Sequence, residues 1–213
     1  MSREAELRAA LVAAGARLFS AGLVAGRDGN LSARLDDDRV LITPRGVSKG
    51  HLTPHALAVV RLDGTLVSGP TPSTEQSMHL AAYAARPDVQ AAVHAHPPTA
   101  TGFAVAGETL PDDVLPELTA GVGPVAFVPF GRPGTGALAR ELTPYWAGHD
   151  AFLLANHGAL TVGRSVTEAL HRMESMEQAA RIVLAARQLG TVHRWPSDDV
   201  EALRDQWRHE RSR

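Results

Sequence analysis

The sequence has 213 residues, of which 44% are hydrophobic, and a formal net charge of −2 at pH 7. The length and hydrophobic content predict one domain over residues 1–213, and the near-zero charge gives no electrostatic basis for binding nucleic acid or an anionic membrane. The chain contains no cysteine, which excludes disulfides and thiolate zinc sites and leaves His, Asp and Glu as candidate metal ligands.

The N-terminal half of the chain is predicted to begin with a helix and to continue as β-hairpins. Apolar residues recur at helical spacing over residues 3–20, and Gly22 follows as a stop signal. The Asp63-Gly64 pair is a strong signal for a tight hairpin turn. The predicted strand pairs are 31–35 with 40–42, and 58–62 with 65–67.

Helices and strands alternate from residue 70 onward. Ser73, with Gln76 three residues later, matches a capping box and predicts a helix that ends at Pro87. Further strands are expected at 89–96, 125–128 and 151–155, with 160–162 as a candidate continuation of the last, and further helices at 97–106, 136–146, 165–188 and 196–208. Early hairpins and later alternation favour a single α/β domain with a mixed, largely antiparallel sheet.

The sequence shows no signal for export or membrane insertion. Residues 1–20 carry charges and lack an apolar core segment, so they do not match a signal peptide. No apolar run is long enough to span a bilayer. We therefore expect a soluble, cytoplasmic protein.

Three histidines and one carboxylate form a candidate metal site. His94 and His96 are two residues apart on a predicted strand, so their side chains share one face. Alone, such a pair is more often two hydrogen-bonded polar side chains than a metal site. His157 follows another apolar strand beside Gly158, and Glu75 precedes the histidine strand by one helix length. Three histidines plus a carboxylate or water match a catalytic zinc ligand set.

Three loops are candidates for binding an anion near that metal. Ser73 and Thr74 lie at a predicted helix start, where backbone N–H groups are free, although simple N-capping explains them equally well. Gly29-Asn30 and Arg45-Gly46 are further loops, and ordinary turns use the same residue types. A carboxylate at the position of Glu75 is also favoured by the helix dipole alone. The remaining histidines are taken as structural or surface residues.

Together these motifs resemble the class II aldolase/adducin family, which includes L-fuculose-1-phosphate aldolase and L-ribulose-5-phosphate 4-epimerase. The matching segments occur in the family's order and spacing over roughly residues 5–190. They are Gly29-Asn30-x-Ser32, Ile42-Thr43-Pro44-x-Gly46, Pro72-Ser73-Thr74-Glu75-x-x-x-His79, Val93-His94-x-His96-Pro97 and Asn156-His157-Gly158.

The resemblance implies a three-layer α/β/α fold with a central mixed sheet, and a homotetramer with active sites at subunit interfaces. It implies a zinc ion, or else Mn²⁺, Co²⁺ or another divalent metal, held by His94, His96 and His157. Glu75 would ligate the empty metal and then act as acid and base. The implied phosphate pocket consists of Gly29, Asn30, Arg45, Gly46, Ser73 and Thr74.

The implied activity is first a zinc-dependent aldolase, which cleaves a ketose 1-phosphate to dihydroxyacetone phosphate and an aldehyde through an enediolate. The alternatives are a sugar-phosphate 4-epimerase, a dehydratase or a 3-oxo-acid-phosphate decarboxylase, and then a non-catalytic adducin-like scaffold. Tyrosines expected on the aldehyde side are missing, which leaves Glu117 as the candidate acid there. Arg45 replaces a small hydroxyl residue, which fits a different phosphate pose or a substrate carboxylate.

Overall fold

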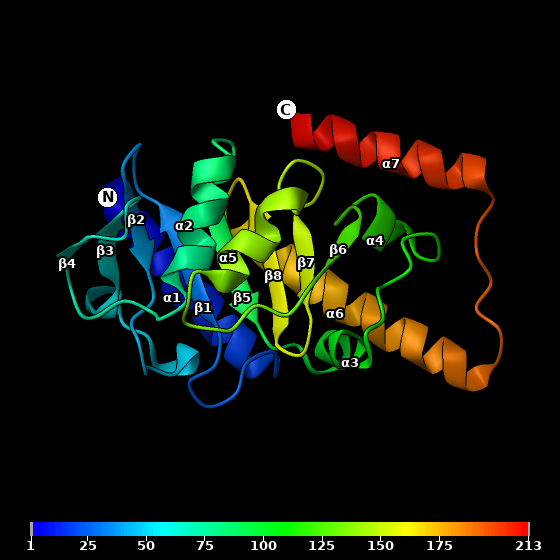
Figure 1. Cartoon of the computed structure of the whole chain (residues 1–213), viewed down its shortest axis with the longest axis horizontal. Coiled ribbons are helices and arrows are strands. Elements are labelled where there is room, and N and C mark those ends of the chain that lie inside the picture. Colours follow the sequence, from blue (N-terminus) through cyan, green and yellow to red (C-terminus); the bar gives the residue numbers. More distant parts are fainter. Residues whose placement is uncertain (1, 213) are drawn as a thin grey trace.

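A mixed β-sheet runs through the middle of this computed structural model, which describes residues 2–212, so that residues 1 and 213 of the predicted domain lie outside it (Figure 1). The described residues form eight strands in the order β4-β3-β2-β1-β5-β8-β7-β6, with β6 and β7 parallel and the other pairs antiparallel. The strands are β1 Asn30–Arg34, β2 Arg39–Ile42, β3 Ala58–Arg61, β4 Leu66–Ser68, β5 Ala91–Ala95, β6 Val125–Val128, β7 Ala151–Leu154 and β8 Gly158–Gly163.

Helices cover both faces of the sheet, which confirms the three-layer α/β/α architecture (Figure 1). One face packs against α1, α3, α4 and α6, and the other packs against α2 and α5. The helices are α1 Arg3–Ser20, α2 Gln76–Ala85, α3 Pro98–Ala106, α4 Pro116–Thr119, α5 Ala137–Leu142, α6 Val166–Leu189 and α7 Ser197–Ser212. None of the described helices combines the length and apolar content that a bilayer crossing requires.

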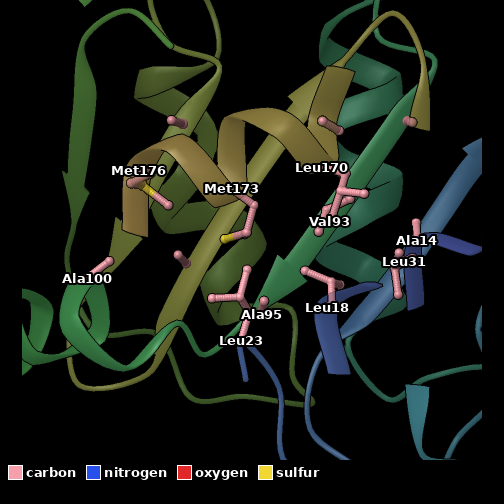
Figure 2. Close-up of a cluster of buried hydrophobic side chains, with 14 of the residues drawn as sticks. Ala14, Leu18, Leu23, Leu31, Val93, Ala95, Ala100, Leu170, Met173 and Met176 are labelled. Carbon is pink, nitrogen blue, oxygen red and sulfur yellow. The ribbon is translucent and has the colours of Figure 1, made fainter. Parts of the chain in front are cut away.

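Strand β5 shows how the two cores fix the direction of the histidines. Val93 and Ala95 point into the layer of α1 and α6, where they pack near Leu18 and Met173 (Figure 2). Side chains alternate along a strand, so His94 points to the opposite face, below α2. The buried alanines and Val93 of β5 specify the register, because a one-residue slip would place a histidine in the apolar layer.

The structure corrects three of the predicted elements. Helix α2 begins at Gln76, and Glu75 is its N-cap residue, so Ser73 forms no capping box. Residues 160–162 do not continue the preceding strand: they belong to β8, which returns antiparallel to β7. The predicted helix 136–146 is divided into α5 and a short 3₁₀ turn, Thr143–Tyr145, because Pro144 lacks the N–H needed to continue it.

Candidate active site

The three predicted histidines meet at one end of the central strands. His94 lies on β5 and is fully buried, and His96 follows one residue after the strand ends. His157 lies in the turn between β7 and β8, where Asn156 adopts a left-handed conformation with φ 55°. One ring nitrogen from each histidine lies within 4.8 Å of the others. The end of β5 and the turn between β7 and β8 therefore supply a compact group of imidazoles.

The ring nitrogens are oriented as metal ligands would be. His94 Nδ1 donates to the carbonyl oxygen of Ala159 at 2.8 Å, which leaves the His94 Nε2 lone pair facing the cluster. His94 Nε2 and His96 Nε2 are 3.2 Å apart. Two ligands at the usual Zn–N distance in a tetrahedral site are about 3.3 Å apart, so this spacing fits a tetrahedral divalent cation.

Glu75 closes the cluster from the start of α2. Its two carboxylate oxygens lie 3.4 Å from His94 Nε2 and 3.1 Å from His157 Nε2. Oε2 accepts a hydrogen bond from Asn30 Nδ2 at 2.8 Å. Oε1 is buried and makes no hydrogen bond with the described residues. A buried carboxylate oxygen without a donor, beside three imidazoles, is what a cation site requires.

The ionisation of these groups is suited to metal binding. Burial alone would raise the pKa of Glu75, but the adjacent imidazoles of His157 and His94 outweigh burial and lower it, so the group is a carboxylate at neutral pH. Burial, followed by the charges of His94 and His157, lowers the pKa of His96 to about 4. A neutral imidazole is the form that ligates a metal.

Gly158 is required by the packing around His96. A Cβ atom at Gly158 would lie 2.5 Å from His96 Cδ2 and 2.7 Å from the Ala95 carbonyl oxygen. Any larger residue would displace the imidazole or the end of β5. The donor set, its spacing and this close approach all fit a divalent cation held by His94, His96 and His157 with Glu75.

The three predicted anion-binding loops also come together beside the cluster. An isolated β-bridge joins Pro44 to Pro72, and Ser73 N donates to the Thr43 carbonyl oxygen at 3.1 Å. The loop 26–30 lies next to these two loops, because Leu31, the residue that follows it, donates its N–H to Thr43 Oγ1 at 3.1 Å. All of the predicted pocket residues belong to these loops: Gly29, Asn30, Arg45, Gly46, Ser73 and Thr74.

The loop residues differ in burial and in role. Gly29 has φ +72°, and a Cβ there would lie 2.7 Å from the His94 carbonyl oxygen, so glycine is required at this approach. Asn30 and Ser73 are buried, whereas Arg45, Gly46 and Thr74 are exposed at the rim. The rim residues are accessible to a ligand from solvent, and the buried ones shape the floor.

Sequence reasoning missed Lys49, a buried cation between these loops. Its side chain is 2% exposed, and Nζ donates to the carbonyl oxygens of Arg27 at 2.9 Å and Val47 at 2.6 Å. Burial lowers the pKa of Lys49, and the negative charges of Asp28 and Glu75 oppose that shift. A single lysine in a polar loop carries no sequence signal for burial, so only the folded chain reveals it.

Glu117 is not brought to the cluster within one chain. It is exposed on α4, which packs on α6 and α7, and its neighbour Leu118 is buried in the core on the α6 side of the sheet. The histidines open on the other side, below α2. The expectation that Glu117 serves as an acid beside the metal is therefore not supported by its position in this chain.

Comparison with known proteins identifies the family. A model of the Class II Aldolase and Adducin N-terminal domain matches residues 9–184. The chain therefore belongs to the class II aldolase and adducin family, as the motifs indicate. The family region contains Glu75 and all three clustered histidines, and it ends within α6.

Individual relatives cover most of the chain. The chain is 36% identical to a 3-oxo-tetronate 4-phosphate decarboxylase of Haemophilus influenzae, over 81% of this chain and 84% of that protein. It is 33% identical to a 5-deoxy-D-ribulose 1-phosphate aldolase of Bacillus thuringiensis, over 92% of each chain. The crystal structure of YgbL from Klebsiella pneumoniae has a TM-score of 0.88 and 37% identity, over 94% of this chain and 99% of that one.

Proposed function

We propose that this protein is a divalent-metal-dependent lyase that decarboxylates a phosphorylated 3-oxo sugar acid. The observation that carries the proposal is the similarity to several 3-oxo-tetronate 4-phosphate decarboxylases at 36–37% identity, combined with the cluster of His94, His96, His157 and Glu75. This favours the decarboxylase alternative over the ketose 1-phosphate aldolase that was expected first.

The reaction needs an electron acceptor next to the bond that breaks. In a 3-oxo acid the C1–C2 bond breaks, carbon dioxide leaves, and the electron pair passes toward the C3 carbonyl oxygen. A bound divalent ion would supply Lewis-acid stabilisation of that developing negative charge. Glu75, held beside the histidines, would take up a proton from solvent water on a carboxylate oxygen and deliver it to C2, which completes the exchange of CO₂ for H⁺.

The three loops beside the cluster would hold the phosphate. Backbone N–H groups near Gly29, Gly46 and Thr74, together with the Arg45 guanidinium at the rim, offer donors and positive charge suited to a phosphate or a carboxylate. Their placement next to the imidazoles supports a substrate that spans both parts of the site. The substrate class is accordingly a small phosphorylated sugar derivative.

Aldol cleavage is the second candidate, because aldolases are also among the relatives. The 5-deoxy-D-ribulose 1-phosphate aldolase of Bacillus thuringiensis matches a larger share of the chain than the decarboxylases, at lower identity. Both reactions leave negative charge on the carbon next to a carbonyl, so the same residues would serve either one. Only the group that departs differs.

A product assay separates the two reactions. Purified protein reconstituted with Zn²⁺, Mn²⁺ or Co²⁺ is given a 3-oxo-tetronate 4-phosphate and, separately, a panel of ketose 1-phosphates. We expect stoichiometric carbon dioxide from the first and little dihydroxyacetone phosphate from the second. Aldehyde release from a ketose 1-phosphate, without carbon dioxide from the 3-oxo acid, would reassign the protein as an aldolase.

Metal binding is tested by content and by substitution. We expect elemental analysis to find about one divalent ion per chain. The ion should be lost in His94→Ala, because the two remaining imidazoles and one carboxylate would bind it too weakly to retain it through purification. His55→Ala is a matched control, since His55 is exposed and outside the cluster. Full metal content in His94→Ala would contradict the assignment.

We also propose the homotetramer with sites at subunit interfaces that the family resemblance implies. Light scattering during size-exclusion chromatography would give the mass directly, against 22.6 kDa for one chain. A monomeric mass together with full activity would contradict this assembly. Cytoplasmic location likewise remains a prediction, which fractionation of the source cells would check.

A further inference from the structure

A chain of buried hydrogen bonds runs from α2 through β1 to Glu75. Ser32 Oγ lies 2.7 Å from Tyr83 Oη and 2.7 Å from His79 Nδ1. His79 Nε2 is hydrogen-bonded to Asn30 Oδ1, and Asn30 Nδ2 donates to Glu75 Oε2 at 2.8 Å. The chain thus ends on the carboxylate that closes the histidine cluster.

The secondary structure explains why these side chains meet. Asn30 and Ser32 are two residues apart on β1, which is about 6.6 Å along a strand. His79 and Tyr83 are four residues apart on α2, which is about 6 Å along a helix. The pair on α2 faces the pair on β1, and the two spacings are nearly equal, so both helix side chains reach a partner on β1. His79 is 0% exposed.

The chemistry of the end groups gives every bond one direction. A carboxylate only accepts, so the NH₂ of Asn30 faces Glu75 and its Oδ1 must face His79. His79 therefore carries its proton on Nε2 and accepts at Nδ1 from the Ser32 hydroxyl. Burial lowers the pKa of His79 to about 3, followed by the charge of His94, and Glu75 opposes the shift, which agrees with a neutral ring.

We propose that His79 is a positioning residue that fixes the orientation of the Asn30 amide. Through that amide it determines which carboxylate oxygen of Glu75 has no hydrogen bond and is available to carry the proton. With Oε2 occupied by Asn30, Oε1 keeps its lone pairs and faces His157. Without His79, the amide of Asn30 would rotate, and Oε2 would lose its donor in a fraction of molecules. This role rests on the proposed function of Glu75 as the proton-carrying group.

Kinetics of matched variants test the role. For His79→Leu we expect kcat to fall about 10–100-fold, the range for outer-shell partners of a metal site, with KM changed far less. His79→Gln offers both a donor and an acceptor, so it should recover most of the lost kcat. The control pair is His149→Leu and His149→Gln, because His149 is a half-buried histidine bonded to the Tyr145 carbonyl oxygen in the same layer.

A double-mutant cycle separates positioning from mere support of the fold. If His79 acts through Asn30, then His79→Leu added to Asn30→Ala should change kcat by less than about 2-fold. A full additional loss in the double variant, or equal kcat values for the Leu and Gln variants, would overturn the proposal. Urea unfolding and metal content of each variant identify any that fail to fold.

The tautomer of His79 is a readout that needs neither the substrate nor a stable variant. ¹⁵N NMR of the native holoenzyme should show His79 neutral with the proton on Nε2, and Asn30→Ala, which removes the acceptor that faces Nε2, should introduce the other tautomer. A proton on Nδ1 in the native protein would overturn the inference even if the enzyme is active. Absence of carbon dioxide release with the expected tautomer would instead count against the proposed function alone.

Discussion

Lys49 places a positive charge where two of the predicted anion-binding loops meet. Its Nζ donates to backbone carbonyls of both loops, at Arg27 and Val47, so the ammonium group fixes their separation. The same charge lies close enough to Asp28 and Glu75 to interact with them. A buried lysine that is held by neutral carbonyls keeps part of its charge available to a bound anion.

Replacing Lys49 with methionine keeps the length of the side chain and removes the charge. We expect KM for the phosphorylated substrate to rise by about 10-fold or more, because the loss of one charged hydrogen-bond donor costs roughly 1.5–3 kcal/mol. The metal content should be unchanged. Steady-state kinetics and inorganic phosphate binding would check this, and unchanged KM with unchanged phosphate affinity would contradict it.

The low pKa of His79 makes stability depend on pH. Below the ordinary histidine value of about 6.5 the unfolded chain takes up a proton, whereas the folded chain does not until about pH 3. The free energy of unfolding therefore falls as pH decreases through this window. Between pH 7 and pH 5 the loss from this one group is about 2 kcal/mol.

Comparison with His79→Gln isolates that contribution, since glutamine does not titrate. Urea unfolding of the metal-free proteins at pH 7 and pH 5 should show a larger decrease for the native chain. If the free energy of unfolding fell equally in both proteins between pH 7 and pH 5, His79 would be taking up its proton in the folded state over the same pH range as in the unfolded chain.

The candidate metal ligands could be predicted from the sequence better than the residues that support them. His94 and His96 follow from the alternation of a strand, because spacing alone fixes a shared face. The hydrogen bonds of Asn30 and the burial of Lys49 depend on which segments fold together. Neither is encoded within a short stretch of residues.

At the scale of elements, a buried carboxylate joins α6 to the start of α3. Glu177 is 2% exposed, accepts from Thr99 N and Ala100 N, and pairs with Arg181 Nε at 2.7 Å. A carboxylate at a helix N-terminus satisfies free N–H groups and complements the helix dipole. Since α3 begins two residues after His96, this contact also fixes where β5 must end.

Glu177→Gln should destabilise the fold by about 2 kcal/mol, because an amide oxygen accepts more weakly than a carboxylate from Thr99 N and Ala100 N, and the ion pair with the exposed Arg181 is lost. The matched control is Glu174→Gln on the same helix, whose pair with the exposed Arg17 should contribute less than about 1 kcal/mol. Urea unfolding measures both. Equal losses would mean that burial does not distinguish these carboxylates.

Most element types were predictable, and the errors have identifiable causes. The capping box failed because Ser73 N bonds to Thr43 in another loop, a tertiary contact that shifts the helix start to Gln76. The strand 151–155 was extended too far because the turn at Asn156 uses a left-handed conformation that asparagine adopts only in some contexts.

At the scale of the molecule, α7 lies beyond the family region and packs across α4 (Figure 1). Trp207 is 6% exposed, and its ring fills the space beside Gly123. Arg211 bonds to Asp150 and to the Ala147 carbonyl oxygen. Trp207, the buried Val200 and a few polar contacts thus hold α7 against the rest of the molecule.

Trp207→Ala should release α7 while the α/β/α core stays folded. We expect faster proteolysis within residues 190–196 and a change of less than about 1 kcal/mol in the unfolding of the core, because few core contacts are lost. Gln206→Ala, an exposed change on the same helix, is the control. Cooperative loss of the whole fold in Trp207→Ala would show that α7 is integral to it.

The distribution of the clustered side chains has a consequence for the dynamics of the sheet. His94 lies on β5, His157 on the turn into β8, and Glu75 at the start of α2, so three segments would be tied at one point. Opening any of them would release the ion, and amide deuterium exchange in β5 and β8 should slow as free metal rises above its dissociation constant. Occupancy could then be followed in the backbone itself, without a substrate, and chelation should restore the faster exchange.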